Sequence, residues 1–114
     1  MNILQELTGL LSGLGIRVET GVFKGKAPEE YCVVTPMSDF YGLFADDQPQ
    51  YETQEARISL FSKSNYITRK NQIVKALLAA EFIITDRTYI GFEEDTEYFH
   101  VAIDCAKPYE IEEG

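Results

Sequence analysis

The sequence predicts an α+β fold, in which a mostly antiparallel sheet carries two helices packed on one face. Three observations lead to this class. Two segments repeat apolar residues at helical spacing, several others alternate apolar and polar residues as strands do, and turn-forming residues separate consecutive strands. The expected order of elements is α-β-β-(β)-β-α-β-β. The 114 residues, of which 45% are hydrophobic, fit one domain over residues 1–114.

The N-terminal segment 1–14 is predicted to be helical, with the helix itself at residues 2–14. Asn2 suits the N-cap and Gly15 the C-terminal cap. Each of the two glycines inside the helix costs about 1 kcal/mol relative to alanine, so the helix needs a partner surface. The apolar face consists of Ile3, Leu4, Leu7, Leu10, Leu11 and Leu14.

Two strands are predicted directly after this helix. Residues 16–23 alternate apolar and polar side chains, and residues 31–35 form a dense β-branched and aromatic run. Pro36 is expected to end or edge the second strand, because proline cannot donate a hydrogen bond to a sheet. The segment 24–30 between the two strands contains glycine and proline and is expected to be a loop.

The long strand Tyr51–Ser62 is predicted from strict alternation. It places Ala56, Ile58 and Leu60 on a face suited to the core. The opposite face carries paired charge, which suits a part of an assembly better than an active site. A further short strand, Tyr41–Ala45, is expected in the aromatic segment before it.

A second helix is predicted to begin at Ser64 or Asn65 and to run to about Ala80. Its apolar residues are Tyr66, Ile67, Ile73, Val74, Leu77 and Leu78, and the residues expected to face outward are Arg69, Lys70, Asn71 and Lys75.

Two strands follow the second helix, at residues 82–90 and 97–105. The turn-rich segment 91–96 between them predicts a hairpin. Lys107 and Pro108 are expected to end the last strand, so that residues 106–114 form an acidic C-terminal tail.

The chain is acidic, with a formal net charge of −9 from 19 acidic and 10 basic residues. Proteins that grip phosphate backbones need a clustered positive surface, so specific binding of DNA or RNA is not expected. In the simpler interpretation the acidity keeps the protein soluble. In the sharper one it creates a surface that repels DNA or imitates it.

No cofactor or metal site is expected. Cys32 and Cys105 form no CxxC pair, and one histidine cannot complete a zinc site with them. Both lie in apolar strand-like runs, so buried free thiols are expected rather than a disulfide. The N-terminus has no basic region, carries Glu6 and is too short to span a bilayer, so we expect a cytosolic protein without signal or membrane anchor.

His100 and Asp104 share one face of a predicted strand and can be interpreted as a general-base dyad. The alternative is a strand histidine that is hydrogen-bonded or exposed. No nucleophile signature accompanies the pair, so no catalytic residue is assigned.

Acidic residues crowd the predicted hairpin turn, where Glu93 and Glu94 lie. Such a cluster can hold Ca²⁺, but the EF-hand pattern is absent and a solvated turn is the simpler interpretation. The same holds for Asp46 and Asp47.

Two loop features suit protein contacts. Lys24 and Lys26 lack the phosphate-loop pattern and suit a mobile basic loop that meets an acidic neighbour. Phe40, Tyr41 and Phe44 are interpreted either as interface anchors or as core residues, since a chain this small needs most of its aromatic rings inside.

Four stretches carry a family resemblance: residues 21–39, Ala45-Asp46, residues 51–66 and residues 84–110, within a region of about 15–113. They resemble a family of small structural proteins of tailed bacteriophages and prophages of Gram-positive bacteria. These proteins are described as tail completion, tail terminator or head–tail joining proteins.

The resemblance implies a non-enzymatic α+β subunit that closes the end of a tail tube or joins it to the capsid connector. It implies a homo-oligomeric ring, typically a hexamer, whose partners are the tail tube protein and the head-completion or connector proteins. DNA passes through such a ring without specific binding, and an acidic lumen would repel its backbone. The subunit would be made in the cytoplasm of the bacterial host and end in the virion tail or neck.

Ring contacts are heterologous, so two different patches must match. The hypothetical acidic patch consists of Asp46, Asp47, Glu93 and Glu94, and the hypothetical basic patch of Lys24, Lys26, Arg69 and Lys70. The aromatic residues Phe40 and Tyr41 are candidate interface anchors.

Two other functions compete with this one. An acidic DNA mimic of phage origin, inhibiting a nucleic-acid enzyme, would need carboxylates spaced like phosphates, and interleaved basic residues disturb that spacing. A small hydrolase-like enzyme would use His100 with Asp104.

Overall fold

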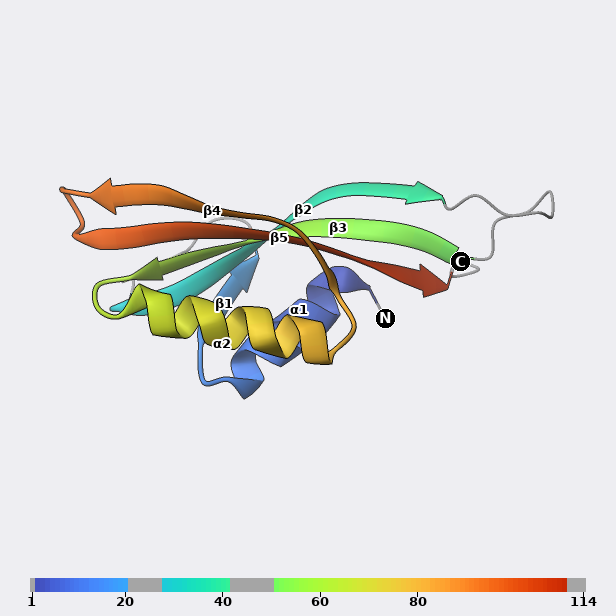
Figure 1. The fold of residues 1–114 in the computed structure, drawn as a ribbon, viewed down its shortest axis with the longest axis horizontal. Coiled ribbons are helices and arrows are strands. Elements are labelled where there is room, and N and C mark those ends of the chain that lie inside the picture. The colour runs from blue at the N-terminus through green and yellow to red at the C-terminus, as the bar shows by residue number, and fades with distance from the viewer. Residues whose placement is uncertain (1, 21–27, 42–50, 111–114) are drawn as a thin grey trace.

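The computed structural model describes residues 2–20, 28–41 and 51–110 (Figure 1). Within these ranges the elements are α1 (Ile3–Gly13), β1 (Arg17–Thr20), β2 (Glu30–Tyr41), β3 (Tyr51–Ser62), α2 (Tyr66–Ala79), β4 (Ile83–Glu93) and β5 (Tyr98–Glu110). The described strands form one sheet in the order β1-β2-β3-β5-β4. β1 pairs with β2 in parallel, and the other neighbouring strands are antiparallel. The predicted α+β class and order of elements are confirmed.

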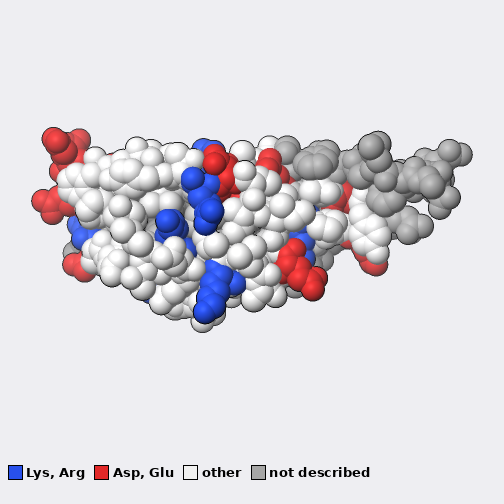
Figure 2. Space-filling model, in the orientation of Figure 1, with Lys and Arg blue, Asp and Glu red and all other residues white. Residues whose placement is uncertain are grey.

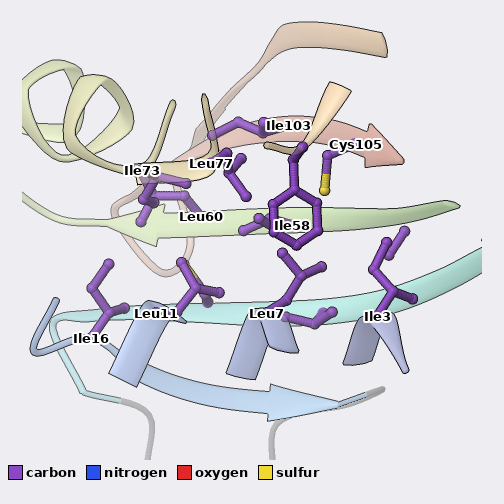
Figure 3. Packing of buried hydrophobic residues seen from close by; sticks show 14 of the residues in the cluster. Ile3, Leu7, Leu11, Ile16, Ile58, Leu60, Ile73, Leu77, Ile103 and Cys105 are labelled. Carbon is purple, nitrogen blue, oxygen red and sulfur yellow. The ribbon is translucent and has the colours of Figure 1, made fainter. Parts of the chain in front are cut away.

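The hydrophobic core lies between the sheet and the helices, because α1 and α2 pack on the same face (Figures 1 and 3). α1 buries Leu7 and Leu11, which lie four residues apart and so share one helical face. α2 buries Ile73 and Leu77 at the same spacing. The strands meet them with Cys32, Val34, Ala56, Ile58, Leu60, Val101, Ile103 and Cys105. The predicted core face of β3 is therefore confirmed.

The ends of α1 match the predicted caps. The Asn2 side chain accepts a hydrogen bond from the Gln5 backbone N–H at 2.9 Å, and Gln5 Oε1 accepts one from the Asn2 backbone N–H at 3.1 Å. Gly15 follows the helix with φ 82°, a left-handed conformation that favours glycine. The Ile16 N–H then donates to the Leu11 carbonyl, which brings Ile16 into the core.

α2 begins at the predicted cap Asn65, whose side chain accepts a hydrogen bond from the Thr68 N–H. Like α1, it is followed by a residue in the left-handed conformation, but this residue is a glutamate and not a glycine. Glu81 has φ 68°, and the Phe82 N–H donates to the Leu77 carbonyl at 2.9 Å. A side chain in this conformation costs about 1–2 kcal/mol.

Replacing Glu81 with glycine should therefore raise the free energy of unfolding by about 0.5–1 kcal/mol, after the higher chain entropy of unfolded glycine is deducted. Urea unfolding measures the change. Glu81→Ala is the control, since it removes the same charge but keeps a β-carbon in the left-handed conformation. Equal stability of the two variants would show that the backbone conformation is not the cause.

The expectation that Pro108 ends the last strand is wrong, whereas Pro36 does not end its strand but lies at an edge of the sheet, the other alternative expected for it. β2 continues through Pro36 to Tyr41, and β5 continues through Pro108 to Glu110. Each proline lies beyond the end of one neighbouring strand. Val34 is the last residue of β2 that pairs with β1, and Ala106 is the last residue of β5 that pairs with β4. A missing N–H is tolerated on such an unpaired side.

Other boundaries shift accordingly. Residues 106–110 belong to the sheet and are not an acidic tail, and Tyr109 is part of the core. Residues 111–114 lie outside the described part. The expected strand Tyr41–Ala45 is described only at Tyr41, where β2 ends. The hairpin turn predicted at residues 91–96 lies at residues 94–97 in the structure, because β4 continues to Glu93.

Candidate functional site

The sheet face opposite the helices carries aromatic rings in register. Tyr31 of β2 lies opposite Phe61 of β3, and Phe61 lies opposite His100 of β5. The rings of Tyr31 and Phe61 stack with centroids 4.9 Å apart, and those of Phe61 and His100 stack at 4.2 Å. Tyr98 stands edge-on to Tyr31 and donates its hydroxyl to the Pro28 carbonyl. The four rings of Tyr31, Phe61, Tyr98 and His100 form what we call the aromatic row.

An ion pair lies on the same face, four residues along β3 and β5 from the aromatic row. Arg57 of β3 lies opposite Asp104 of β5 and donates two hydrogen bonds to it, at 2.7 and 3.0 Å. The Asp104 side chain is 8% exposed, whereas that of Arg57 is 43% exposed. The guanidinium therefore neutralises a carboxylate that has little contact with water.

His100 is not part of a catalytic dyad with Asp104. The two residues share a face but lie four residues apart, about 13 Å along an extended strand. Asp104 is bound to Arg57 instead. The Nε2 atom of His100 is buried without a hydrogen-bond partner. Burial lowers the pKa of His100, and Arg57 lowers it further, against an opposing effect of Glu93.

The stability of the protein should therefore fall as the pH is lowered from 7.5 to 5.5. The unfolded histidine, with a pKa of about 6.5, takes up a proton that the folded ring resists. The contribution of His100 to the free energy of unfolding is fully present above the pKa of the histidine in the unfolded chain. It decreases as the pH falls toward the lower pKa of the histidine in the folded protein. Urea unfolding at each pH measures the effect, and His100→Phe should flatten the curve while it keeps the stacking. Parallel curves for the two proteins would contradict this assignment.

Cys32 and Cys105 are both buried and free, as predicted. Burial raises the pKa of each thiol to about 12, so both stay protonated at neutral pH. Within residues 2–20, 28–41 and 51–110, no three histidine, cysteine or acidic side chains gather as a metal site would require. Neither helix of the described chain is long and apolar enough to cross a bilayer.

Arg69, predicted to face outward in the basic patch, makes its hydrogen bonds within the subunit. Its Nε atom donates to Glu30 Oε1 at 2.8 Å, and its Nη1 atom donates to the Leu14 carbonyl at 3.1 Å and to Gln72 at 2.9 Å. The side chains of Arg69 and Glu30 are each 25% exposed. Arg69 thus joins α2 to β2 and to the end of α1, so the residue expected to face outward is only partly exposed and its charge is paired within the subunit.

The other predicted interface residues are scattered. Glu93 and Glu94 are exposed at the β4–β5 turn, and Figure 2 shows acidic side chains gathered at this end of the molecule. Lys70 is half-buried on α2. Phe40 and Tyr41 pair with β3 at the end of β2. Lys24, Lys26, Asp46 and Asp47 lie outside the described residues.

Large apolar side chains are exposed along β4, which the sequence did not single out. They are Ile83, Tyr89, Ile90 and Phe92, each 46–60% exposed. On α2, Ile67 and Leu78 are 52% and 59% exposed, so their predicted place on the buried face is wrong. We call these six residues the β4 edge surface.

A groove separates α2 from the first half of β4. It is lined by Val74 and Leu78 from the helix and by Ile84 and the three residues after it, and its volume is about 420 Å³. At the other end of β4, Tyr89 stacks on Tyr66, and Phe92 packs on Phe99 at 4.9 Å. The groove and the half-exposed ring of Phe92 thus lie along the same strand.

No protein-family model matches the chain, and no curated protein sequence matches it.

Proposed function

We propose that this chain is a non-enzymatic structural subunit of a tailed bacteriophage or prophage. In this proposal it acts in tail completion, as a terminator, or in head–tail joining, and it assembles as a ring at the end of the tail tube. It would be made in the cytoplasm of the host and end in the virion tail or neck. The sequence resemblance to such proteins is the starting point.

The observation that carries the proposal is the β4 edge surface. Exposed apolar side chains that gather on one strand and the adjoining helix are typical of surfaces that contact other protein chains. On the sheet face opposite the helices, Arg57 and Asp104 pair with each other within the subunit. The net charge of −9 would repel DNA that passes through a ring.

The test is to mix the purified chain with tail tubes reassembled from the tail tube protein of the same phage or prophage. Negative-stain images should show tubes capped at one end, and uncapped tubes should remain when the chain is omitted. An excess of chain that leaves every tube end uncapped would overturn the proposal. An unrelated acidic protein of similar size serves as the control for non-specific sticking.

Lys70 allows a test of the basic patch that leaves the internal contacts of Arg69 unchanged. Lys70→Glu should weaken ring assembly severalfold in low salt, because it reverses a charge that would face an acidic neighbour. Static light scattering on the chain with and without tail tubes measures the assembled mass. An unchanged mass would exclude Lys70 from the contact.

A further inference from the structure

β4 is an edge strand with unusual exposure. It pairs with β5 on one side, and among the described residues no strand pairs with its other side. The strand at the opposite edge, β1, has four residues, whereas β4 has eleven. A long edge with exposed apolar side chains is a template for another strand.

The pairing with β5 shows which way the side chains of β4 point, because residues directly opposite each other share a face. Register shifts occur between Ile84 and Asp86 and between Tyr89 and Gly91, so the regular stretch runs from Asp86 to Tyr89. On the helix side lie Ile84, Arg87, Tyr89 and Phe92, and on the open side lie Ile83, Asp86 and Thr88.

We propose that the β4 edge binds the β4 edge of a second copy of this chain, antiparallel and around a twofold axis at Thr88. A twofold pairing must place residues of the same face opposite each other. An axis at Asp86 or at Arg87 would set like charges face to face. An axis at Thr88 avoids this. It also places residues of the same face opposite each other, both between the two register shifts and beyond them.

On the helix side, the contacts in this register are complementary. Arg87 lies opposite Tyr89 of the other copy, where a guanidinium can lie over a ring. Ile84 lies opposite Phe92 of the other copy. The ring of Phe92, 46% exposed in one subunit, would then enter the groove that Leu78 and Ile84 line in the other, and the reverse contact follows by symmetry.

A second copy is the occupant that these observations favour, since one short sequence supplies both the projecting ring and the groove that receives it. The pairing closes on itself and does not rest on the proposed function. It joins two subunits through the β4 edge surface, so the ring of the proposed function would have to be built from such pairs through other surfaces.

Thr88→Glu tests the axis directly. Thr88 is exposed, and its hydroxyl donates to Asp86 at 3.1 Å. In the pair, the two introduced carboxylates would face each other beside both copies of Asp86, so association should weaken by about tenfold or more. Analytical ultracentrifugation of the full chain over a dilution series should show twice the 12.9 kDa chain mass, and the variant one chain mass. Ser12→Glu, an exposed change of equal charge on α1, should leave the pair intact.

Mixing gives the expected rescue. Thr88→Glu and Thr88→Lys proteins should form a mixed pair, because opposite charges then meet at the axis. In addition, Thr88→Cys should form a disulfide between two chains on mild oxidation, since opposite Cα atoms lie about 4.5–5.5 Å apart. Asp86→Cys should not, since its two copies would lie about 13 Å apart. The native thiols are buried and do not compete.

Several results would overturn the pairing. They are a wild-type protein that stays a single chain at every concentration, a Thr88→Glu protein that associates as well as the wild type, and a crosslink at Asp86 in place of Thr88. A larger mass that survives Thr88→Glu unchanged would also overturn it, but would leave the tail-completion proposal standing. Circular dichroism of each variant confirms that the subunit is folded.

Discussion

Replacing Ile73 with alanine should lower the free energy of unfolding by about 2–5 kcal/mol. Ile73 is completely buried between α2 and the sheet (Figure 3), so its loss removes buried apolar surface and leaves a cavity. Urea unfolding followed by circular dichroism measures the change. In a domain of this size, a loss in this range is a large part of the total stability.

Ile67 provides a matched control on the same helix. It is the same residue type, but 52% of it is exposed. Ile67→Ala should change the free energy of unfolding by less than about 0.5 kcal/mol, while it brings the same gain in helix propensity. Similar losses at the two positions would contradict the orientation of α2 on the sheet.

Removing Arg57 should destabilise the protein far more than removing its partner. Arg57→Ala leaves the almost buried carboxylate of Asp104 without a cation, which should cost about 2–3 kcal/mol. Asp104→Ala leaves a guanidinium that already reaches water, so its loss should be about 1 kcal/mol or less. Thermal and urea unfolding of both variants at pH 7 measure the difference.

The double variant Arg57→Ala with Asp104→Ala supplies the check on this asymmetry. It removes the stranded carboxylate, so it should be more stable than Arg57→Ala alone. A double variant whose losses are the sum of the two single losses would show that the charges act independently. In that case the pair would be a surface contact and would not neutralise a buried group.

Local patterns in the sequence were sufficient to predict the order of the elements and the buried faces of α1 and β3. The alternation of β3 and the helical spacing of α1 each report which side of an element is apolar, and that side is the one that packs. The caps at Asn2 and Asn65 are equally local, because a capping side chain bonds to the backbone of its own first turn.

The lateral order of the strands could not be predicted in this way. β5 lies between β3 and β4, and this placement makes β4 an edge and exposes its apolar residues. A period-two pattern gives the faces of a strand but not its neighbours. The positions of β1 beside Pro36 and of β4 beside Pro108 also depend on which strands are neighbours, so a local pattern could not predict that the prolines are tolerated there.

The role of Arg69 was also outside the reach of local reasoning. Its position on α2 relative to neighbouring polar residues indicates an outward direction. Its partner Glu30 lies 39 residues earlier in the chain, on β2. Long side chains such as arginine can lie along a surface and bond to a distant element, and no sequence period records such a contact.

The position of β5 has a consequence for how the protein is made in the cell. β5 is the last described element to leave the ribosome, yet it joins β3 to β4, and its Lys107 and Tyr109 bind Glu6 of α1. A nascent chain that stops short of β5 holds β1, β2 and β3 as one group, β4 not joined to them, and α1 without the two contacts of its Glu6. We therefore expect folding to finish after translation has passed residue 110, and a premature stop in β5 to yield a chain that proteases degrade.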